Sequence, residues 1–151
     1  AVGQFIPRKG FDILLRSIKD LPSHIGVYFI GGKITREYEN IISDLKLKNI
    51  HFLEFMDSEK LSLYYKASDI FILPTREDIW GLVINEAMAY GLPIITTNKC
   101  VAGVQLLDHQ DITIIPPEDS LSLRDSIKKH CIEDMAQEHI NIFSQHKILN
   151  Q

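Results

Sequence analysis

Residues 74–93 read Pro-Thr-Arg-Glu-Asp-Ile-Trp-Gly-Leu-Val-Ile-Asn-Glu-Ala-Met-Ala-Tyr-Gly-Leu-Pro and stand between two apolar runs. The runs, at 70–73 and 94–97, are rich in β-branched residues, so the segment predicts strand, polar loop, short helix and strand. Gly81 would begin the helix and Gly91 would end it, because glycine takes the left-handed conformation common at helix ends. This order predicts a loop and a helix N-terminus at the edge of a sheet.

The same alternation extends in both directions along the chain. Apolar runs predict strands at 2–6, 25–30, 50–55, 70–73, 94–97 and 112–115. Helical stripes predict helices at 11–18, 38–45, 61–68, 101–107 and 121–131, with Asp57 or Ser58 capping the third of these and Ser120 the last. Because each parallel crossover needs about a dozen residues and is right-handed, helices would cover both faces of the sheet. We therefore expect one α/β domain over 1–151, a Rossmann-like doubly wound parallel sheet of about six strands, with a helical tail at about 136–151.

The polar loops of this arrangement all follow strands. They occupy residues 3–10, 31–33, 56–58, 74–81 and 98–103. The carboxyl ends of parallel strands meet at one rim, where open α/β sheets bind ligands and helix N-termini attract anions. The loops therefore predict a ligand site at that rim.

Composition narrows the classes of function. The net charge of -4 argues against general nucleic-acid binding, because proteins that bind nucleic acids usually carry more basic than acidic residues. The two cysteines, Cys100 and Cys131, have no metal-ligand spacing and are expected to be buried free thiols in a reducing, cytoplasmic setting. The six histidines likewise predict no metal site, and no apolar run reaches the ~20 residues of a membrane span. Because the chain opens on Ala1-Val2-Gly3, which resembles the end of a strand, we expect an excised domain.

Two short motifs at the rim suit a phosphate ligand. Arg8 and Lys9 stand between the first strand and its helix, where a basic turn beside helix N–H groups suits a diphosphate; the alternative is a pair of surface charges. Gly31 and Gly32 would let a ligand approach the backbone, or would simply turn the chain. Neither the dinucleotide fingerprint nor the P-loop pattern occurs.

Two carboxylates stand in the opening segment, Asp78 in the loop and Glu86 in the helix. A carboxylate accepts bidentate hydrogen bonds from vicinal hydroxyls, so the pair could contact a sugar and a ribose, or could be two surface charges. Trp80 would stack on a ligand or fill a hinge. The backbone N–H groups of the helix start are candidate anion donors, while side chains further along are most simply core: Leu82, Val83, Ala87 and Met88.

These residues together resemble the nucleotide-sugar motif of family 4 glycosyltransferases, which have the GT-B fold. In that motif Pro-Ser/Thr, Glu, Gly-Leu-Val, Glu-Ala-Met-Ala and Gly-x-Pro-Val-Ile appear in order, and residues 74–93 resemble it. Residues 2–5 with Lys9-Gly10 resemble the family's first strand and diphosphate turn, Gly31-Gly32 its second-strand glycines, and 68–74 its Ala-Asp-hydrophobic-Pro segment. The resemblance covers nearly the whole chain and implies the donor-binding, C-terminal half of a GT-B enzyme.

By position, the resemblance assigns Lys9 to the donor diphosphate and Glu86 to the ribose. Asp78 stands where the family has its first Glu, which contacts the transferred sugar; Glu77 is the alternative, and we favour Asp78 because its spacing to Glu86 is kept. Gln4 replaces an Arg that many members use for the diphosphate, and Arg8 is a candidate substitute. The implied donor contacts are Gly3, Gln4, Arg8, Lys9, Gly10, Gly31, Gly32, Met56, Glu77, Asp78, Trp80, Gly81, Leu82, Val83 and Glu86, of which Lys9 and Asp78 would also be catalytic.

The resemblance implies retaining hexosyl transfer from a UDP- or GDP-sugar without an obligatory metal or cofactor. The acceptor, a sugar or lipid-linked glycan, would sit on an N-terminal domain absent here, so the isolated domain is expected to be inactive. The full-length protein would act in polysaccharide or glycoconjugate synthesis in the cytoplasm. Peripheral association with the inner face of the membrane is the alternative location. The alternatives are another GT-B enzyme, of the epimerase or glycogen-synthase type, and a non-catalytic flavodoxin-like nucleotide-binding module.

Overall fold

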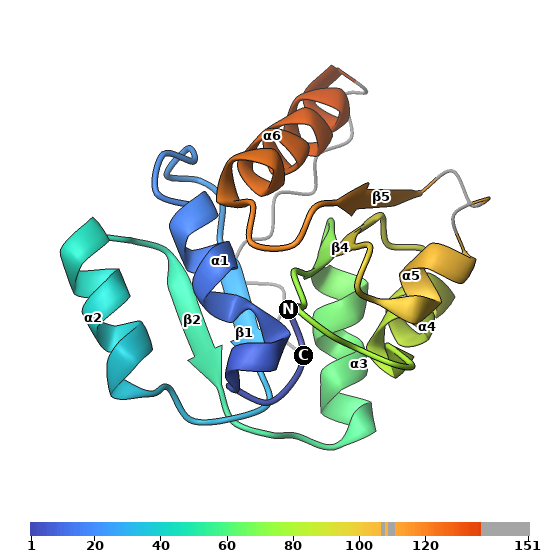
Figure 1. The fold of residues 1–151 in the computed structure, drawn as a ribbon, viewed down its shortest axis with the longest axis horizontal. Coiled ribbons are helices and arrows are strands. Elements are labelled where there is room, and N and C mark those ends of the chain that lie inside the picture. Colours follow the sequence, from blue (N-terminus) through green and yellow to red (C-terminus); the bar gives the residue numbers. More distant parts are fainter. Residues whose placement is uncertain (107, 109–110, 137–151) are drawn as a thin grey trace.

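The computed structural model describes residues 1–106, 108 and 111–136, in which strands and helices alternate along the chain (Figure 1). The strands are β1 Val27–Ile30, β2 Ile50–Leu53, β3 Phe71–Leu73, β4 Ile94–Thr97 and β5 Ile112–Ile115. The helices are α1 Phe11–Ser17, α2 Arg36–Leu45, α3 Ser58–Ala67, α4 Leu82–Ala89, α5 Val101–Gln105 and α6 Ser120–Ala136, and a 3₁₀ turn at Pro7–Lys9 precedes α1. A helix therefore connects each strand to the next, as parallel pairing requires.

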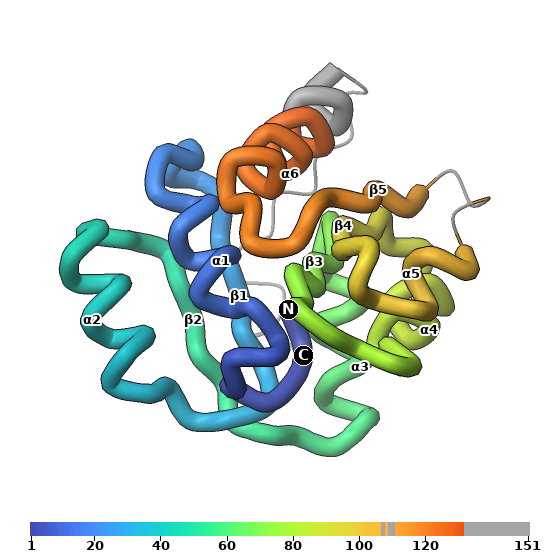
Figure 2. Tube along the Cα trace, viewed as in Figure 1, coloured from blue at the N-terminus to red at the C-terminus, as the bar shows by residue number. Residues whose placement is uncertain are grey.

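All of the strand pairs are parallel. β1 pairs with β2 in one group, and β4 lies between β3 and β5 in the other. The first residues of the chain lie between the two groups (Figure 2): Val2 forms a parallel bridge with Ile30 and also packs against the apolar cluster that contains Leu73. The expected Rossmann-like parallel arrangement is confirmed.

The strand expected at residues 2–6 is wrong beyond Val2, which forms only an isolated bridge to Ile30, so the described residues contain five strands. After Val2 the chain leaves β1, and the ring of Phe5 turns into the core, with its centroid 5.4 Å from that of Phe11. Pro7 then supplies no N–H for a strand ladder. Packing of the half-buried Phe5 ring against the core draws the chain away from β1, and Pro7 would not allow pairing to resume.

The second group of strands carries an apolar core on each face. Ile72 and Ile95 belong to a cluster with α1, α2 and α6, whereas Leu73 and Ile94 belong to a cluster with α3, α4 and α5. Successive side chains of a strand point to opposite faces, so consecutive residues enter different cores. Helices therefore cover both faces, and Figure 1 shows α1 and α6 on the near side with α3 and α4 behind.

Helix ends follow local signals, with one correction. Asp57 accepts the N–H of Lys60 at 2.9 Å and so caps α3, which confirms one of the two expected caps. Ser120 does not cap α6; it is the first helical residue, and the carboxylate of Asp119 accepts two first-turn N–H groups at 3.1 and 2.9 Å. Asp119 stands just before the helix, where its side chain can reach the N–H groups of the first turn and its charge suits the helix N-terminus.

The C-terminal helix is longer than expected. The stripe predicted a helix at 121–131, whereas α6 runs to Ala136. The tail expected at about 136–151 lies outside the described residues after Ala136. No helix of the described part is long and apolar enough to span a bilayer.

Two burial expectations need correction. Cys100 is buried as expected, but Cys131 is only half-buried. In α4, Ala87 is buried and Val83 and Met88 are half-buried, but Leu82 is 69% exposed, because the core face of this helix is centred on Ile84 and Ala87.

Four of the five polar loops meet at one rim. Arg76 donates its backbone N–H to Arg8 O at 2.8 Å, and Asp78 donates its own to Lys99 O at 3.0 Å. A Cβ added to Gly31 would lie 2.5 Å from the carbonyl oxygen of Gly3, so these two loops touch as well. The expected convergence of the loops at 3–10, 31–33, 74–81 and 98–103 is confirmed.

Candidate functional site

The basic turn forms because Pro7 starts it and Gly10 ends it. Proline suits the first position of a helical turn, and Gly10 adopts φ 67° while donating its N–H to Pro7 O at 3.1 Å. A Cβ on Gly10 would lie 1.9 Å from the carbonyl oxygen of Pro74, so only glycine lets the turn approach the loop after β3. The turn presents Arg8, which is exposed, and Lys9, which is half-buried.

Lys9 and Asp78 form an ion pair across this contact. Lys9 Nζ lies 2.5 Å from Asp78 Oδ2, and the two side chains are 15% and 10% exposed. The other carboxylate oxygen, Oδ1, accepts the N–H of Gly81 at 3.1 Å. Since an ammonium group has three N–H donors, Lys9 keeps two for a ligand while bound to Asp78.

Asp78 is held in its charged form. Burial by itself raises the pKa of this carboxyl, but the hydrogen bonds from Lys9 and Gly81 and the charges of Lys9 and Arg8 outweigh burial and lower the pKa below its usual value. The carboxylate is therefore ionised at neutral pH. A buried anion beside a cation with spare donors can accept hydrogen bonds from a ligand whose phosphate contacts the cation.

The loop turns its two neighbouring acids in opposite directions. Asp78 is 7% exposed, whereas Glu77 is exposed. The hydroxyl of Thr75 accepts the N–H of Glu77 at 3.3 Å, which folds the loop tightly, and Asp78 then bridges to Cys100 in parallel. Of the two candidates for the first acidic position, Asp78 is the one in contact with Lys9.

The N-terminus of α4 opens on the same rim. Gly81 is its N-cap residue with φ 51°, and no side chain caps this helix within the described residues. The N–H groups of Leu82 and Val83 therefore face the rim with the positive end of the helix dipole. This end of α4 and the basic turn provide two sources of positive potential around Asp78.

Glu86 lies one turn further along α4 and is held by α3. The hydroxyl of Tyr65 donates to Glu86 Oε2 at 2.9 Å, and the Tyr65 ring stacks on Tyr90 with centroids 5.3 Å apart. Burial, the hydrogen bond to Glu86 and the charge of Glu86 raise the pKa of Tyr65 far above its usual range, so the hydroxyl remains a donor. Glu86 itself is exposed, and its Oε1 atom remains available.

The other candidate residues differ in exposure. Gln4, Glu77, Trp80 and Leu82 are exposed, with Trp80 at 70%, and Met56, Gly3, Gly31, Gly32 and Val83 are half-buried. Trp80 thus fills no buried hinge, and its indole is available at the rim. Gly32 packs on Phe5, since a Cβ there would lie 2.5 Å from the ring.

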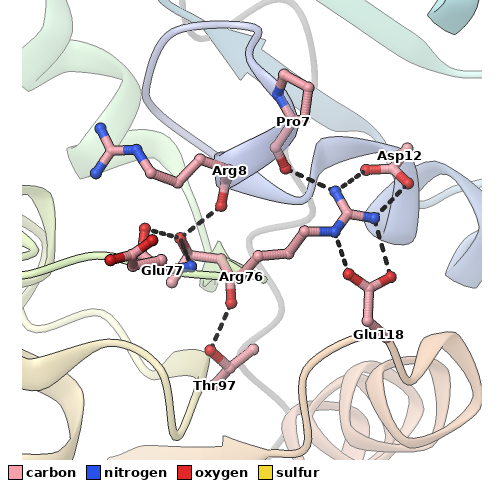
Figure 3. A network of polar contacts seen from close by, with 8 residues as sticks. Pro7, Arg8, Asp12, Arg76, Glu77, Thr97 and Glu118 are labelled. Atoms are coloured by element: carbon pink, nitrogen blue, oxygen red, sulfur yellow. Dashed lines mark hydrogen bonds and ion pairs between the residues drawn. The ribbon is translucent and has the colours of Figure 1, made fainter.

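Two residues that the motif analysis did not select have central contacts. Tyr65 orients Glu86, and Arg76 makes five hydrogen bonds beside the basic turn (Figure 3). Arg76 was visible as a basic residue two positions before Asp78, but its partners are distant in sequence. Among the described residues, no group of three or more His, Cys, Asp or Glu side chains could hold a metal ion.

Comparison with known proteins places this arrangement in a family. The family model described as glycosyl transferases group 1 matches residues 1–145. The chain therefore belongs to the glycosyl transferases group 1 family, and its fold is that of one half of a GT-B glycosyltransferase.

Individual relatives agree with this assignment. An uncharacterized glycosyltransferase of Methanocaldococcus jannaschii is 31% identical over 108 residues, covering 71% of this chain and 30% of that protein. The lipopolysaccharide glucosyltransferase WaaG of Escherichia coli is 28% identical over 119 residues, covering 76% and 31%. The crystal structure of Anabaena HepE in complex with UDP-glucose superposes with a TM-score of 0.78 at 24% identity, covering 90% of this chain and 39% of that one. The chain thus spans about a third of the length of these relatives.

Proposed function

We propose that this domain binds the nucleoside diphosphate part of a UDP- or GDP-sugar and supports retaining hexosyl transfer in polysaccharide or glycoconjugate synthesis. The observation that carries the proposal is the Lys9–Asp78 pair beside the open N-terminus of α4. A diphosphate needs cationic and N–H donors, and the sugar attached to it needs an acceptor nearby. The Lys9 ammonium and the first N–H groups of α4 are the donors, and the Asp78 carboxylate beside them is the acceptor.

The proposed donor lies across the rim. Lys9 binds the diphosphate together with the N–H groups of Leu82 and Val83. Arg8 takes over the diphosphate contact of the family's arginine, which is Gln4 in this chain. Asp78 accepts a hydroxyl of the transferred sugar, and Glu86 accepts the ribose hydroxyls through the oxygen that Tyr65 leaves available. As the glycosidic bond breaks, the cations and the helix dipole stabilise the negative charge that develops on the departing diphosphate.

The relatives support this reading by what their names state. WaaG is named a lipopolysaccharide glucosyltransferase, and HepE is described in complex with UDP-glucose. By analogy, an acceptor sugar or lipid-linked glycan would bind mainly to an N-terminal domain, and the full-length protein would work in the cytoplasm, peripherally at the inner membrane face. The chemistry at the rim requires no metal ion in this proposal.

Isothermal titration calorimetry with UDP, GDP, ADP and FMN tests the binding function. We expect UDP or GDP to bind. Lys9→Ala and Glu86→Ala should each lower the affinity for the preferred nucleotide by about 10- to 100-fold, since a hydrogen bond to a charged group contributes about 1.5–3 kcal/mol. Lys66→Ala and Glu39→Ala, which replace exposed residues of α3 and α2, are the matched controls. Binding of FMN alone, or equal affinity of wild type and Glu86→Ala, would contradict the proposal.

Asp78 is tested with a sugar-bearing ligand. Asp78→Asn should lose most of the additional affinity of the nucleotide sugar over the free nucleotide, while Glu77→Gln should keep it. The reverse result would transfer the role to Glu77.

The isolated domain is proposed to bind donor without transferring sugar. Incubation of the purified domain with UDP- or GDP-sugar and candidate acceptors should give no glycosylated product by mass spectrometry. Detectable transfer by the domain alone would refute the need for an N-terminal partner domain.

A further inference from the structure

Arg76, in the loop after β3, uses every donor of its guanidinium group. Its side chain is 29% exposed and contacts three segments of the chain (Figure 3). Nη1 and Nη2 donate to the two carboxylate oxygens of Asp12 at 2.8 Å each, and Nη1 also donates to Pro7 O at 2.6 Å. Nε and Nη2 donate to the carboxylate of Glu118, the latter at 3.0 Å.

These contacts exclude Arg76 as a ligand-binding cation in this arrangement. A guanidinium group has five N–H donors, and the five bonds to Asp12, Pro7 and Glu118 occupy them all. Two carboxylates also face one positive charge, so the cluster offers no net attraction to a phosphate. Arg76 is therefore to be understood through what it holds in place.

What Arg76 holds is the basic turn. Its guanidinium binds the carbonyl of Pro7, its backbone N–H binds the carbonyl of Arg8 at 2.8 Å, and the hydroxyl of the preceding Thr75 binds the same Arg8 carbonyl at 2.9 Å. The next residue of the turn is Lys9, whose ammonium reaches Asp78. The loop that carries Asp78 thus also anchors the backbone from which Lys9 extends.

Glu118 shows that the third segment is constrained as well. It is not glycine, yet its φ is 60°, a left-handed conformation that is unfavourable for residues with a Cβ. Such a conformation persists where surrounding contacts impose it, and the paired bonds to Arg76 are such contacts. Asp12 stands in the first turn of α1, so the cluster joins α1, the basic turn and the loop before α6 to one side chain.

We propose that Arg76 is a positioning residue that fixes the basic turn relative to Asp78, and so sets the geometry with which Lys9 meets a diphosphate. This inference rests on the proposed function for its consequence in binding. The positional part, the restraint of the turn, stands on the contacts of Arg76 alone.

The first test measures the restraint without any ligand. Arg76→Lys retains the positive charge but cannot reach both carboxylates and Pro7 O with one planar group. Hydrogen–deuterium exchange, read by mass spectrometry, should be faster in a peptide covering residues 4–11, whose Lys9 and Gly10 amides bind Ile6 O and Pro7 O. Exchange at the wild-type rate in this peptide would overturn the inference. Asp12→Asn, a milder change, should show the same acceleration if Arg76→Lys does not fold.

Arg124→Lys is the matched control. Arg124 is similarly half-buried and also binds one carboxylate, Asp20 at 3.2 Å, and one carbonyl, Ser17 O at 3.2 Å, but it joins α6 to the far end of α1. Its replacement should leave exchange of the 4–11 peptide unchanged. Equal acceleration in both variants would reduce the role of Arg76 to general stability and overturn the inference.

The second test is a double-mutant cycle on binding of UDP or GDP, whichever the wild type prefers. Arg76→Lys alone should weaken binding by about tenfold, and should add little in the Lys9→Ala background, because the two residues would act through one contact. Equal losses in both backgrounds would contradict action through Lys9. If the wild type binds no nucleoside diphosphate, the proposed function fails, whereas the exchange experiment still decides whether Arg76 restrains the turn.

Discussion

Asp78 and Glu77 are neighbouring acids with different environments, and the difference is made by the backbone. Thr75 folds the loop so that Asp78 enters the rim, bridges to Cys100 and meets Lys9 at 2.5 Å, while Glu77 faces solvent. Only the buried carboxylate can form an ion pair with little competition from water. At this scale, function depends on which of two similar side chains the chain turns inward.

Tyr65→Phe tests whether Glu86 must be oriented. The substitution removes one hydroxyl whose hydrogen bond to Glu86 contributes about 0.5–1.5 kcal/mol, so the affinity for UDP or GDP should fall by roughly 2- to 10-fold. The ring stays in its stack with Tyr90, so the free energy of unfolding should change little. Calorimetric titration gives the affinity and urea unfolding gives the stability.

Tyr64→Phe is the control for this prediction, since Tyr64 is the preceding residue of α3 and lies near Tyr28 instead of Glu86. It should bind nucleotide as the wild type does. A Tyr65→Phe protein with unchanged affinity would show that Glu86 needs no such partner.

Among the elements, the basic turn and α4 owe their positions to close backbone contacts. The turn can approach the loop after β3 because Gly10 has no side chain, and the start of α4 can lie against Cys100 because Gly81 has none. Both glycines also adopt positive φ, which glycine accepts without strain. Conformation and contact space therefore act together at these two positions.

Gly10→Ala and Gly91→Ala separate these two effects. Both glycines have φ near 70°, but a Cβ at Gly91 would meet no atom within 4 Å, whereas one at Gly10 would overlap Pro74 O. Gly91→Ala should lower the free energy of unfolding only by the left-handed strain, roughly 1–2 kcal/mol. Gly10→Ala should lower it clearly more and should also abolish nucleotide binding. Urea unfolding curves of the two variants measure the difference; equal costs would show that the turn can move away from Pro74.

In the whole molecule, α6 joins the described core through one face. Leu123 and Ile127 are buried with α1 and the sheet, and α6 lies beside the upper end of α1 in Figure 1. Leu121, two residues earlier, is 62% exposed. The helix is therefore part of the domain and not an appendage of it.

Leu123→Ala should destabilise the whole domain. Truncating a fully buried leucine side chain lowers the free energy of unfolding by about 2–5 kcal/mol, whereas Leu121→Ala should change it by no more than about 0.5 kcal/mol. The unfolding transition of Leu123→Ala should remain single and shift to lower urea. A two-step transition would show that α6 detaches separately from the rest.

Acid should weaken the molecule through two carboxylates at the rim. At Asp12 and Asp78, burial raises the pKa but the bonds from Arg76 and Lys9 outweigh it, so the pKa of each is lower in the folded than in the unfolded chain. The unfolded state therefore binds more protons in acid, and the stability these groups contribute is present above about pH 4 and is lost as the pH falls through their folded values. Urea midpoints measured from neutral pH to about pH 2.5 should decline over that range.

Asp12→Asn should lower stability at pH 7 and flatten this decline, and Asp44→Asn, an exposed change on α2, should do neither. A decline as steep in Asp12→Asn as in the wild type would assign the acid sensitivity to other groups.

Much of the fold and of the rim followed from the sequence by local rules. Apolar runs and stripes predicted the five strands and six helices of the described part, because periodicity reports which side of each element is buried. Strand ends rich in polar and glycine residues predicted the shared rim, because parallel strands bring their carboxyl ends together. The predictions for the segment 2–6, the cap of α6 and the burial of Leu82 were wrong, since each depends on a contact or position fixed elsewhere: the packing of Phe5 on Phe11, the place of Asp119 just before the helix and the core face centred on Ile84.

The sequence by itself determined the parallel α/β architecture, the family resemblance and the set of candidate residues, because these follow from periodicity and from motifs within short windows. Only the tertiary structure decided that Lys9 pairs with Asp78 across 69 residues, that Tyr65 holds Glu86 across 21, and that Arg76 reaches Asp12 across 64. Such pairs form where separate loops and helices pack side by side, and no local preference of the chain records which side chains will then meet. The physical reason is that packing of the two cores fixes the loops, and the loops in turn select the contacts.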